Sequence, residues 1–216
     1  MAGKLVCGID EAGRGCVIGP LVIAAFAAAP RDLRKLKDYG VADSKVLSPR
    51  RRLELFQIFK QHYRFEYVVI KPRKVSESLR VHGGMGLNEV EYMSIAELVK
   101  RFRPDVVYVD SPDRDVRKAR SRIVSHVRHD VEVRCMVHGD SRNVLIAAAS
   151  IVAKVMRDKK IEQLRKILGD FGSGYPSDPL TRKWLMENSS KPEYGKYVRH
   201  GWKTLDRLRQ TTLDQF

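Results

Sequence analysis

The chain has 216 residues, of which 43% are hydrophobic, so it can form one main domain with a small appendage around a sizeable core. Its 41 Lys and Arg residues outnumber its 26 Asp and Glu residues, and the resulting formal charge of +15 favours a polyanionic partner such as nucleic acid. Three widely spaced cysteines argue against a disulfide-bonded secreted domain, and the apolar run 16–29 is too short to span a bilayer, so we expect a cytoplasmic protein.

The first part of the chain is predicted to form strands and one helix. Residues 4–10 and 17–28 are apolar stretches joined by a short segment with two glycines, which indicates two strands and a tight turn. Apolar residues at helical spacing predict a helix over 50–63, and the apolar segment 65–71 predicts a third strand.

The rest of the chain is predicted to alternate between helices and strands. Ser111 and Pro112 are typical of a helix start, and small residues after Asn143 permit a long, closely packed helix. Strands that are grouped first and then alternate with helices favour an α/β fold, in which helices flank a mixed sheet. The predicted elements are helices at 88–102, 112–127 and 143–168, strands at 105–110 and 131–137, an ordered loop at 170–180, and short helices at 179–189 and 201–209.

Four acidic residues lie where predicted strands end. Asp10 and Glu11 end the first strand, Asp110 ends another, and Asp140 follows a third at its junction with a helix. Because ligands of α/β sheets bind beyond the strand ends, these carboxylates are expected to converge on one place. Clustered carboxylates repel one another unless they share cations, and oxygen ligands suit Mg²⁺ or Mn²⁺. Two such ions can activate a water and stabilise the leaving oxygen of a phosphodiester.

Each acid also has a purely structural interpretation. Asp110 is well placed to cap the helix that begins at Pro112, and Asp140 to serve as a turn or cap residue before Asn143. Asp10 is a residue type that often forms a turn at a strand end. The pattern alone leaves both interpretations open.

The string GIDEAGRGCVIGP at 8–20 closely resembles the N-terminal signature of the ribonuclease HII family, apart from Cys16, where many members have proline. The resemblance implies a ribonuclease H-like mixed β-sheet flanked by helices, with a small C-terminal helical lobe. It divides the chain into a catalytic domain over 1–169, a lobe with a substrate-contacting loop over 170–209, and a tail at 210–216. Further blocks in the family's order and spacing are DSK at 43–45, YVDSPD at 108–113, AAASIVAKVMRD at 147–158 and GSGYPSDP at 172–179.

The resemblance also assigns roles to individual residues. It implies that Asp10, Glu11, Asp110 and Asp140 are the catalytic, metal-binding carboxylates, with Mn²⁺ or Mg²⁺ as cofactor. The implied activity is that of an endonuclease, acting in DNA replication and repair, that cuts the RNA strand of RNA–DNA hybrids and also cuts at ribonucleotides embedded in duplex DNA. A two-metal-ion mechanism would leave 5′-phosphate and 3′-hydroxyl ends.

Substrate contacts are implied for five further residues. Gly13, Arg14 and Gly15 are expected to recognise the 2′-hydroxyl that distinguishes RNA from DNA. Tyr175 is expected to stack on the sugar beside the cut, and Lys45 to contact a phosphate. The alternatives are a loop aromatic with only a packing role at Tyr175 and a solvated lysine at Lys45.

The last residues, QTTLDQF, resemble the short motif by which replication and repair proteins bind the PCNA sliding clamp. Gln210, Leu213 and Phe216 are at helical spacing, although the motif has one terminal aromatic residue where two are usual. The alternative is that these side chains fold back onto the protein.

Two other functions compete with the endonuclease hypothesis. One is a non-catalytic RNA–DNA hybrid binding module recruited to the clamp, in which the acids are structural. The other is a different nuclease of the same fold, such as a junction resolvase, which the GRG and tyrosine blocks disfavour. We expect a monomer, because nothing in the sequence indicates an oligomer.

Overall fold

The computed structural model describes residues 4–41 and 46–202. The chain forms two compact units, and each is built from separate segments of the sequence. The first unit comprises Met1–Ala12, Val22–Val68 and Asn88–Val155, and the second comprises Gly13–Leu21, Val69–Leu87 and Met156–Phe216. The predicted division placed its boundaries after residues 169 and 209, whereas each of these two units takes its residues from three separate segments of the chain.

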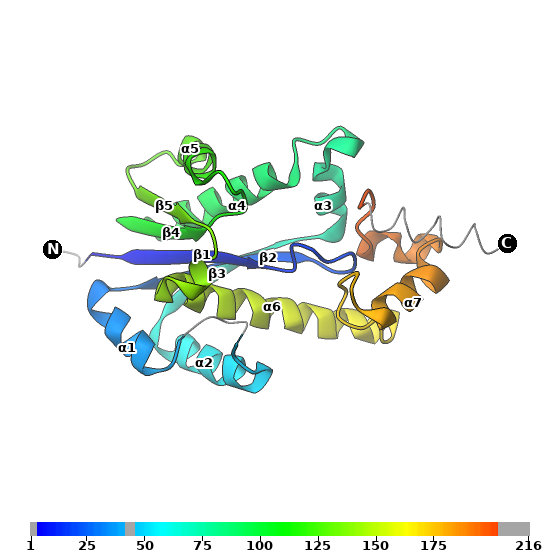
Figure 1. Cartoon of the computed structure of the whole chain (residues 1–216), viewed down its shortest axis with the longest axis horizontal. Helices are drawn as coiled ribbons and strands as arrows, with labels where there is room; N and C mark the ends of the chain where they lie inside the picture. Colours follow the sequence, from blue (N-terminus) through cyan, green and yellow to red (C-terminus); the bar gives the residue numbers. More distant parts are fainter. Residues whose placement is uncertain (1–3, 42–45, 203–216) are drawn as a thin grey trace. The chain divides into compact units, whose positions relative to one another are not determined.

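A mixed sheet of five strands forms the centre of the first unit (Figure 1). In the order β3-β2-β1-β4-β5, β1 is antiparallel to β2 and parallel to β4, and β4 is parallel to β5. β1 and β2 are rich in Val, Ile and Ala and are almost entirely buried, as expected for central strands covered on both faces. The strands are β1 (Val6–Ala12), β2 (Leu21–Ala28), β3 (Arg64–Ile70), β4 (Val106–Asp110) and β5 (Glu132–Met136).

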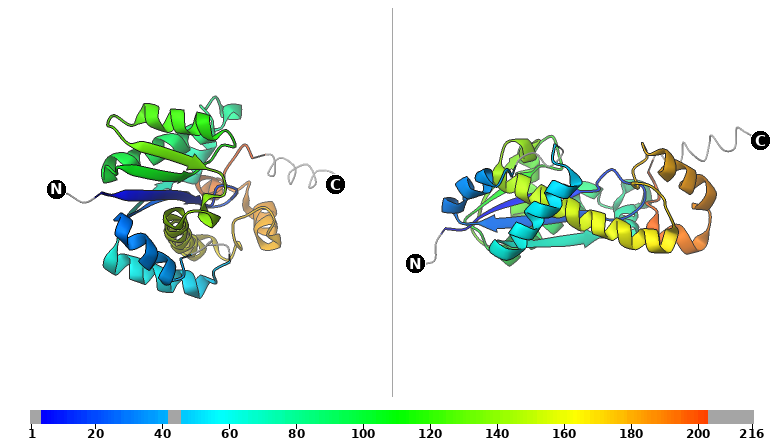
Figure 2. Two further views of the ribbon diagram at one scale, coloured as in Figure 1. Left: turned by 60° about the vertical axis from the view of Figure 1, so that its left-hand side comes forward. Right: turned by 90° about the horizontal axis from the view of Figure 1, so that it is seen from below.

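Helices cover both faces of this sheet (Figures 1 and 2). The helices are α1 (Leu33–Asp38), α2 (Pro49–His62), α4 (Leu87–Phe102), α5 (Val116–His126) and α6 (Val144–Leu168). α4 and α5 lie on one face, and α1, α2 and the first half of α6 lie on the other. Gly8 of β1 lets α6 approach closely, because a Cβ atom there would lie 2.1 Å from the carbonyl carbon of Leu145. The start of α6 is therefore held directly against β1.

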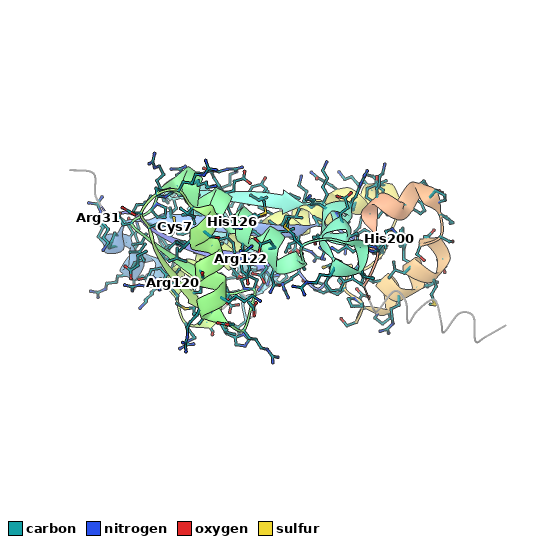
Figure 3. The ribbon with its side chains drawn as sticks, turned by 90° about the horizontal axis from the view of Figure 1, so that it is seen from above. Cys7, Arg31, Arg120, Arg122, His126 and His200 are labelled. Atoms are coloured by element: carbon teal, nitrogen blue, oxygen red, sulfur yellow. The ribbon has the colours of Figure 1, made fainter. Side chains whose placement is uncertain are left out.

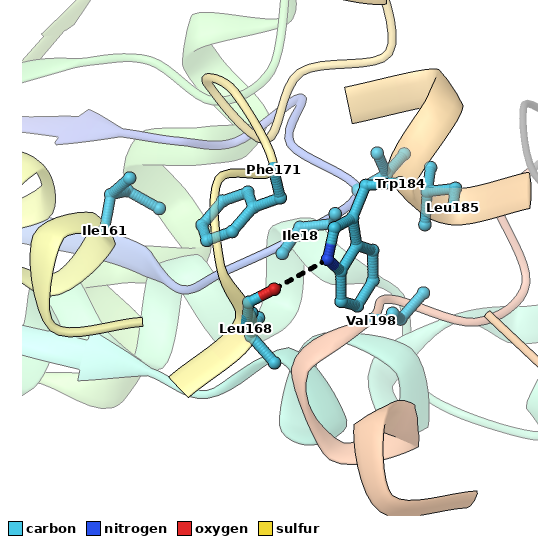
Figure 4. Close-up of a cluster of buried hydrophobic side chains, with 8 residues drawn as sticks. Ile18, Ile161, Leu168, Phe171, Trp184, Leu185 and Val198 are labelled. Atoms are coloured by element: carbon cyan, nitrogen blue, oxygen red, sulfur yellow. Dashed lines mark hydrogen bonds between the residues drawn. The ribbon is translucent and has the colours of Figure 1, made fainter. Parts of the chain in front are cut away.

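The second unit has its own hydrophobic core (Figure 4). It contains α3 (Pro72–Ser78), α7 (Pro179–Asn188) and a 3₁₀ helix (Pro192–Tyr197). The indole N–H of Trp184 donates a hydrogen bond of 2.9 Å to the carbonyl of Leu168, which joins α7 to the end of α6. The core residues are Val17, Ile18, Ile161, Leu168, Phe171, Trp184, Leu185 and Val198.

All five predicted strands and the five longer predicted helices are present, so the predicted fold class is confirmed. The second strand begins at Leu21 and not at residue 17, because Gly19 adopts a φ of +91° and Pro20 follows it. The short helices α1 and α3 were not predicted, since six or seven residues are too few to establish a helical period. None of the described helices is long and apolar enough to cross a membrane.

Candidate active site

The parallel pairing of β1 with β4 places two of the predicted carboxylates together. Ile9 pairs with Val109 in the ladder, and the next residues of the two strands are Asp10 and Asp110. Since parallel strands end at the same edge of a sheet, two acids that are 100 positions apart in the sequence become neighbours there. The apolar residues of β1 and β4 that precede them are buried and fix this register.

Asp140 is brought to the same edge by the turn after β5. Gly139 and Asp140 lie in a short 3₁₀ turn, and the backbone N–H of Gly139 donates to Oδ1 of Asp110 at 3.1 Å. A Cβ atom at position 139 would lie only 2.5 Å from Cδ1 of Ile146, so the turn packs tightly on α6. Asp140 is 4% exposed. The turn thus places buried Asp140 next to the end of β4, where Asp110 is half-buried.

The charges of these three acids act on one another. Burial and, to a smaller extent, the nearby carboxylates of Asp110 and Asp140 raise the pKa of Asp10 to about 7, against hydrogen bonds from Ser150 and the backbone of Glu11 that lower it. The Glu11 N–H donates to Oδ1 of Asp10 at 2.7 Å. Without a cation, the ionised form of Asp10 is therefore less favourable than that of an ordinary aspartate. A divalent cation would remove this penalty, and oxygen donors are the ligands that Mg²⁺ and Mn²⁺ prefer.

In this structure the acidic side chains are not close enough to one another to form a metal-ligand shell. Within 4–41 and 46–202, no group of three or more His, Cys, Asp or Glu side chains is close enough to hold a metal ion. Asp10 faces α6, where Ser150 contacts it, whereas Glu11 is the next residue of the same strand, and successive side chains of a strand alternate between faces. The donor chemistry fits a divalent cation, and the ligands would have to move towards one another to bind it.

The cap interpretations of Asp110 and Asp140 are wrong. α5 begins at Val116, and its N-cap is Asp115, whose side chain accepts two backbone N–H bonds of 3.1 Å. The first turn of α6 is satisfied by Asn143, whose Oδ1 accepts from a backbone N–H at 2.9 Å. Asp140 does lie in a turn, which agrees with the alternative interpretation of Asp140 as a turn residue before Asn143. Asp10 lies inside β1, which continues to Ala12, and is not a turn residue.

The Gly13–Gly15 turn belongs to the second unit and is rigidly supported. Gly13 has a φ of +84°, and a Cβ atom there would lie 2.7 Å from the carbonyl oxygen of Pro20. The fully buried Arg199 donates from Nη1 to the carbonyl of Arg14 at 2.9 Å and from Nε to the carbonyl of Gly19 at 3.0 Å. One guanidinium therefore holds both ends of the segment.

Tyr175 lies against this turn. Its ring edge approaches Gly15, where an added Cβ atom would lie 3.9 Å from Cε1 of the tyrosine. Its hydroxyl shares hydrogen bonds with the backbone N–H of Gly13 and the thiol of Cys16. Burial raises the pKa of Tyr175 to about 12, so the phenol stays protonated. The guanidinium of Arg157 lies 4.9 Å from the ring centroid.

Other predicted site residues fall outside the described part of the chain. These are Lys45 and the three tail residues Gln210, Leu213 and Phe216. Conversely, sequence reasoning missed Arg157 and Arg199, which support the turn and the tyrosine from inside the second unit. Arg157 lies in the family block at 147–158, which does not indicate its contacts, and no quoted block contains Arg199.

Exposed arginines lie along α5 of the first unit (Figure 3). Figure 3 shows Arg120 and Arg122 on this helix, with the half-buried His126 at its end. Glu89 binds both Arg122 and His126, the latter at 2.8 Å. The helix also exposes Arg117. Such a surface suits contacts with a phosphate backbone.

Comparisons with known proteins identify relatives of this chain. Residues 7–205 match the family model of ribonuclease HII. The ribonuclease HII of Archaeoglobus fulgidus is 42% identical over 97% of this chain and 98% of its own length. That of Pyrococcus horikoshii is 38% identical over 98% of both chains.

Solved structures give the same result. The ribonuclease H2 of Pyrococcus horikoshii superposes with a TM-score of 0.85 at 36% identity, over 96% of this chain and 98% of that one. The PCNA:RNase HII complex of Archaeoglobus fulgidus contains a chain that superposes with a TM-score of 0.84 at 40% identity, over 98% of this chain and all of that one. Sequence and fold together show that the chain belongs to the ribonuclease HII family of ribonucleases.

Proposed function

We propose that the protein is an endonuclease that hydrolyses the RNA strand of RNA–DNA hybrids and cuts at ribonucleotides embedded in duplex DNA, leaving 5′-phosphate and 3′-hydroxyl ends. The observation that supports this most strongly is the register of β1 and β4, which makes Asp10 and Asp110 neighbours, with Asp140 within electrostatic range. Asp10 and Asp140 are buried and Asp110 is half-buried, so their mutual repulsion favours a bound cation at this sheet edge, even in a chain of net charge +15.

Asp10, Glu11, Asp110 and Asp140 would hold Mn²⁺ or Mg²⁺ in this proposal. When bound, two such ions would supply an activated water and a counter-charge for the leaving oxygen. The sheet register would bring two of these ligands together, and the Gly139 turn would bring a third close to them. Ser150 on α6 donates to Asp10 and would keep that carboxylate oriented.

Recognition of RNA would depend on the second unit. The Gly13–Gly15 turn brings backbone groups close to its surface, and Gly15 is exposed. Backbone amides and carbonyls at such a turn can hydrogen-bond a 2′-hydroxyl, which DNA lacks. Tyr175 would stack on the neighbouring sugar, and Lys45 would contact a phosphate. The cations on α5 would add sequence-independent attraction for the backbone.

The proposal is tested with a duplex that carries one ribonucleotide, a long RNA–DNA hybrid and an all-DNA duplex. We expect cleavage of the first two only in the presence of Mn²⁺ or Mg²⁺, with 5′-phosphate ends shown by mass spectrometry. Asp110→Asn should abolish cleavage while leaving hybrid binding nearly intact, because binding rests mainly on contacts between basic groups and phosphates. Equal cutting of the all-DNA duplex, or cutting in EDTA, would contradict the proposal.

The competing function is a non-catalytic hybrid-binding module. It predicts tight binding of hybrids without product at any metal concentration, and no effect of Asp110→Asn on any assay except stability. Membership of a ribonuclease family and the electrostatic coupling of Asp10 to two other acids favour the enzyme.

We further propose that the tail at 210–216 binds the PCNA sliding clamp. A relative that is 40% identical to this chain has been solved in complex with PCNA. In the sequence of this chain, Leu213 and Phe216 would provide apolar anchors on one helical turn, with Gln210 one turn earlier. Micromolar affinity is expected, on the order of −8 kcal/mol, because a short segment loses conformational entropy when it binds.

A further inference from the structure

Arg157 is an unusually buried charge. Its side chain lies on α6 in the second unit and is 7% exposed. Removing a guanidinium from water is costly unless its N–H groups find acceptors. The burial of this charged side chain therefore indicates a role that offsets the cost of removing it from water.

The contacts of Arg157 connect the predicted substrate-binding residues of the second unit. Nη2 donates to the carbonyl of Ser173 and, at 3.0 Å, to the thiol sulfur of Cys16. The guanidinium carbon lies 4.9 Å from the centre of the Tyr175 ring, which is within cation–π range. Arg157 is thus in contact with the loop before the tyrosine, with the ring itself and with the end of the glycine turn.

These contacts do not satisfy the arginine completely. Its Nε atom is buried and has no hydrogen-bond acceptor among the described residues. This atom lies 3.4 Å from the position that a Cβ atom on Gly13 would occupy, so the side chain runs directly beneath the turn.

We propose that Arg157 is a positioning residue for substrate recognition: it fixes the ring of Tyr175 and the backbone of Ser173 against the Gly13–Gly15 turn. This inference rests on the proposed function, because the ring and the turn are the groups that would contact the ribose. A planar guanidinium can lie over an aromatic face and donate in its own plane at the same time. A lysine ammonium at the same position cannot make both contacts with the same geometry.

A double-mutant cycle on the full-length protein tests the inference. We expect Arg157→Lys to lower kcat/KM on the single-ribonucleotide duplex by about tenfold, the upper range for a desolvated cation–π contact. In a Tyr175→Ala background the same change should cost less than about twofold, because the ring that it positions is gone. Equal losses in both backgrounds would show that Arg157 acts only on the fold, and would overturn the inference.

Arg165→Lys is the matched control. Arg165 is on the same helix and donates to the carbonyl of Gly172 in the same loop at 3.0 Å. It supports that loop at a different residue and does not contact the Tyr175 ring. Its replacement should therefore change kcat/KM by less than about twofold, well below the tenfold loss expected for Arg157→Lys. A tenfold loss in this control would mean that any loosening of the loop suffices, which would also overturn the inference.

A readout in the free protein separates this inference from the proposed function. In spectra of protein with ¹³C-labelled tyrosine, the ring signals of Tyr175 are assigned by their loss in Tyr175→Phe. We expect Arg157→Lys to shift these signals and Arg165→Lys to leave them in place, whether or not the protein cleaves RNA. If Arg157→Lys does not fold, Arg157→Gln replaces it, since the shorter amide removes the charge. Unshifted Tyr175 signals in the folded variant would refute positioning by Arg157.

Discussion

Replacing Asp10 by Asn should stabilise the metal-free protein in a pH-dependent way. Burial and two neighbouring acids raise the pKa of Asp10 to about 7, against about 4 in an unfolded chain. The folded state therefore binds more protons than the unfolded state between these two values, and the parent loses stability as pH rises from about 4 to about 7. A difference of about three pKa units corresponds to about 4 kcal/mol, which is an upper limit for the gain in Asp10→Asn.

The assay is urea unfolding in EDTA at several pH values. We expect Asp10→Asn to be about 2–4 kcal/mol more stable than the parent at pH 8, and the gain to vanish near pH 4. Asp130→Asn, at an exposed position, is the matched control and should show neither effect. Added Mn²⁺ should stabilise the parent more than Asp10→Asn. Parallel pH profiles for parent and variant would refute the account of a buried, mutually repelling set of acids.

Three further predictions concern other parts of the chain. Tyr175→Ala should lower kcat/KM at a single ribonucleotide by an amount corresponding to roughly one to three kcal/mol, and Tyr175→Phe should lower it less; unchanged rates in both would return the tyrosine to a packing role. Deletion of residues 210–216 should leave cleavage of short oligonucleotides unchanged and remove binding to PCNA in a calorimetric titration, and equal binding by the truncated protein would contradict the clamp proposal. Gly8→Ala should lower the free energy of unfolding by about 3 kcal/mol, because the new Cβ atom would lie only 2.1 Å from the backbone of Leu145. If the variant unfolds at the same denaturant concentration as the parent, α6 does not pack against β1 at this position.

The fold was predictable where a local pattern determines the structure. The apolar strands and the long helices have clear periods, so their types and approximate positions followed from the sequence. Their ends depended on details that the pattern does not carry. Asp115 and not Ser111 precedes the first turn of α5, because the side chain of Asp115 accepts the free N–H groups there.

The candidate site was predictable only in part. The positions of Asp10 and Asp110 at the ends of predicted strands, together with the family resemblance, predicted that they lie close together. The parallel register of β1 and β4 makes them neighbours. Arg157 and Arg199 were not found, because their roles depend on contacts between residues that are 141 and 185 positions apart. Such contacts exist only after the chain has folded, and the family block at 147–158 contains Arg157 without indicating which residues it contacts.

Anomalous diffraction from a crystal soaked in Mn²⁺ tests the central claim most directly. The account predicts a manganese peak between the carboxylates of Asp10 and Asp110 at the shared edge of β1 and β4, and its loss in Asp110→Asn crystals. Soaking should draw the acids together, since they are not yet arranged as a ligand shell. Manganese bound elsewhere, with none at this edge in a protein that cleaves RNA, would contradict the account.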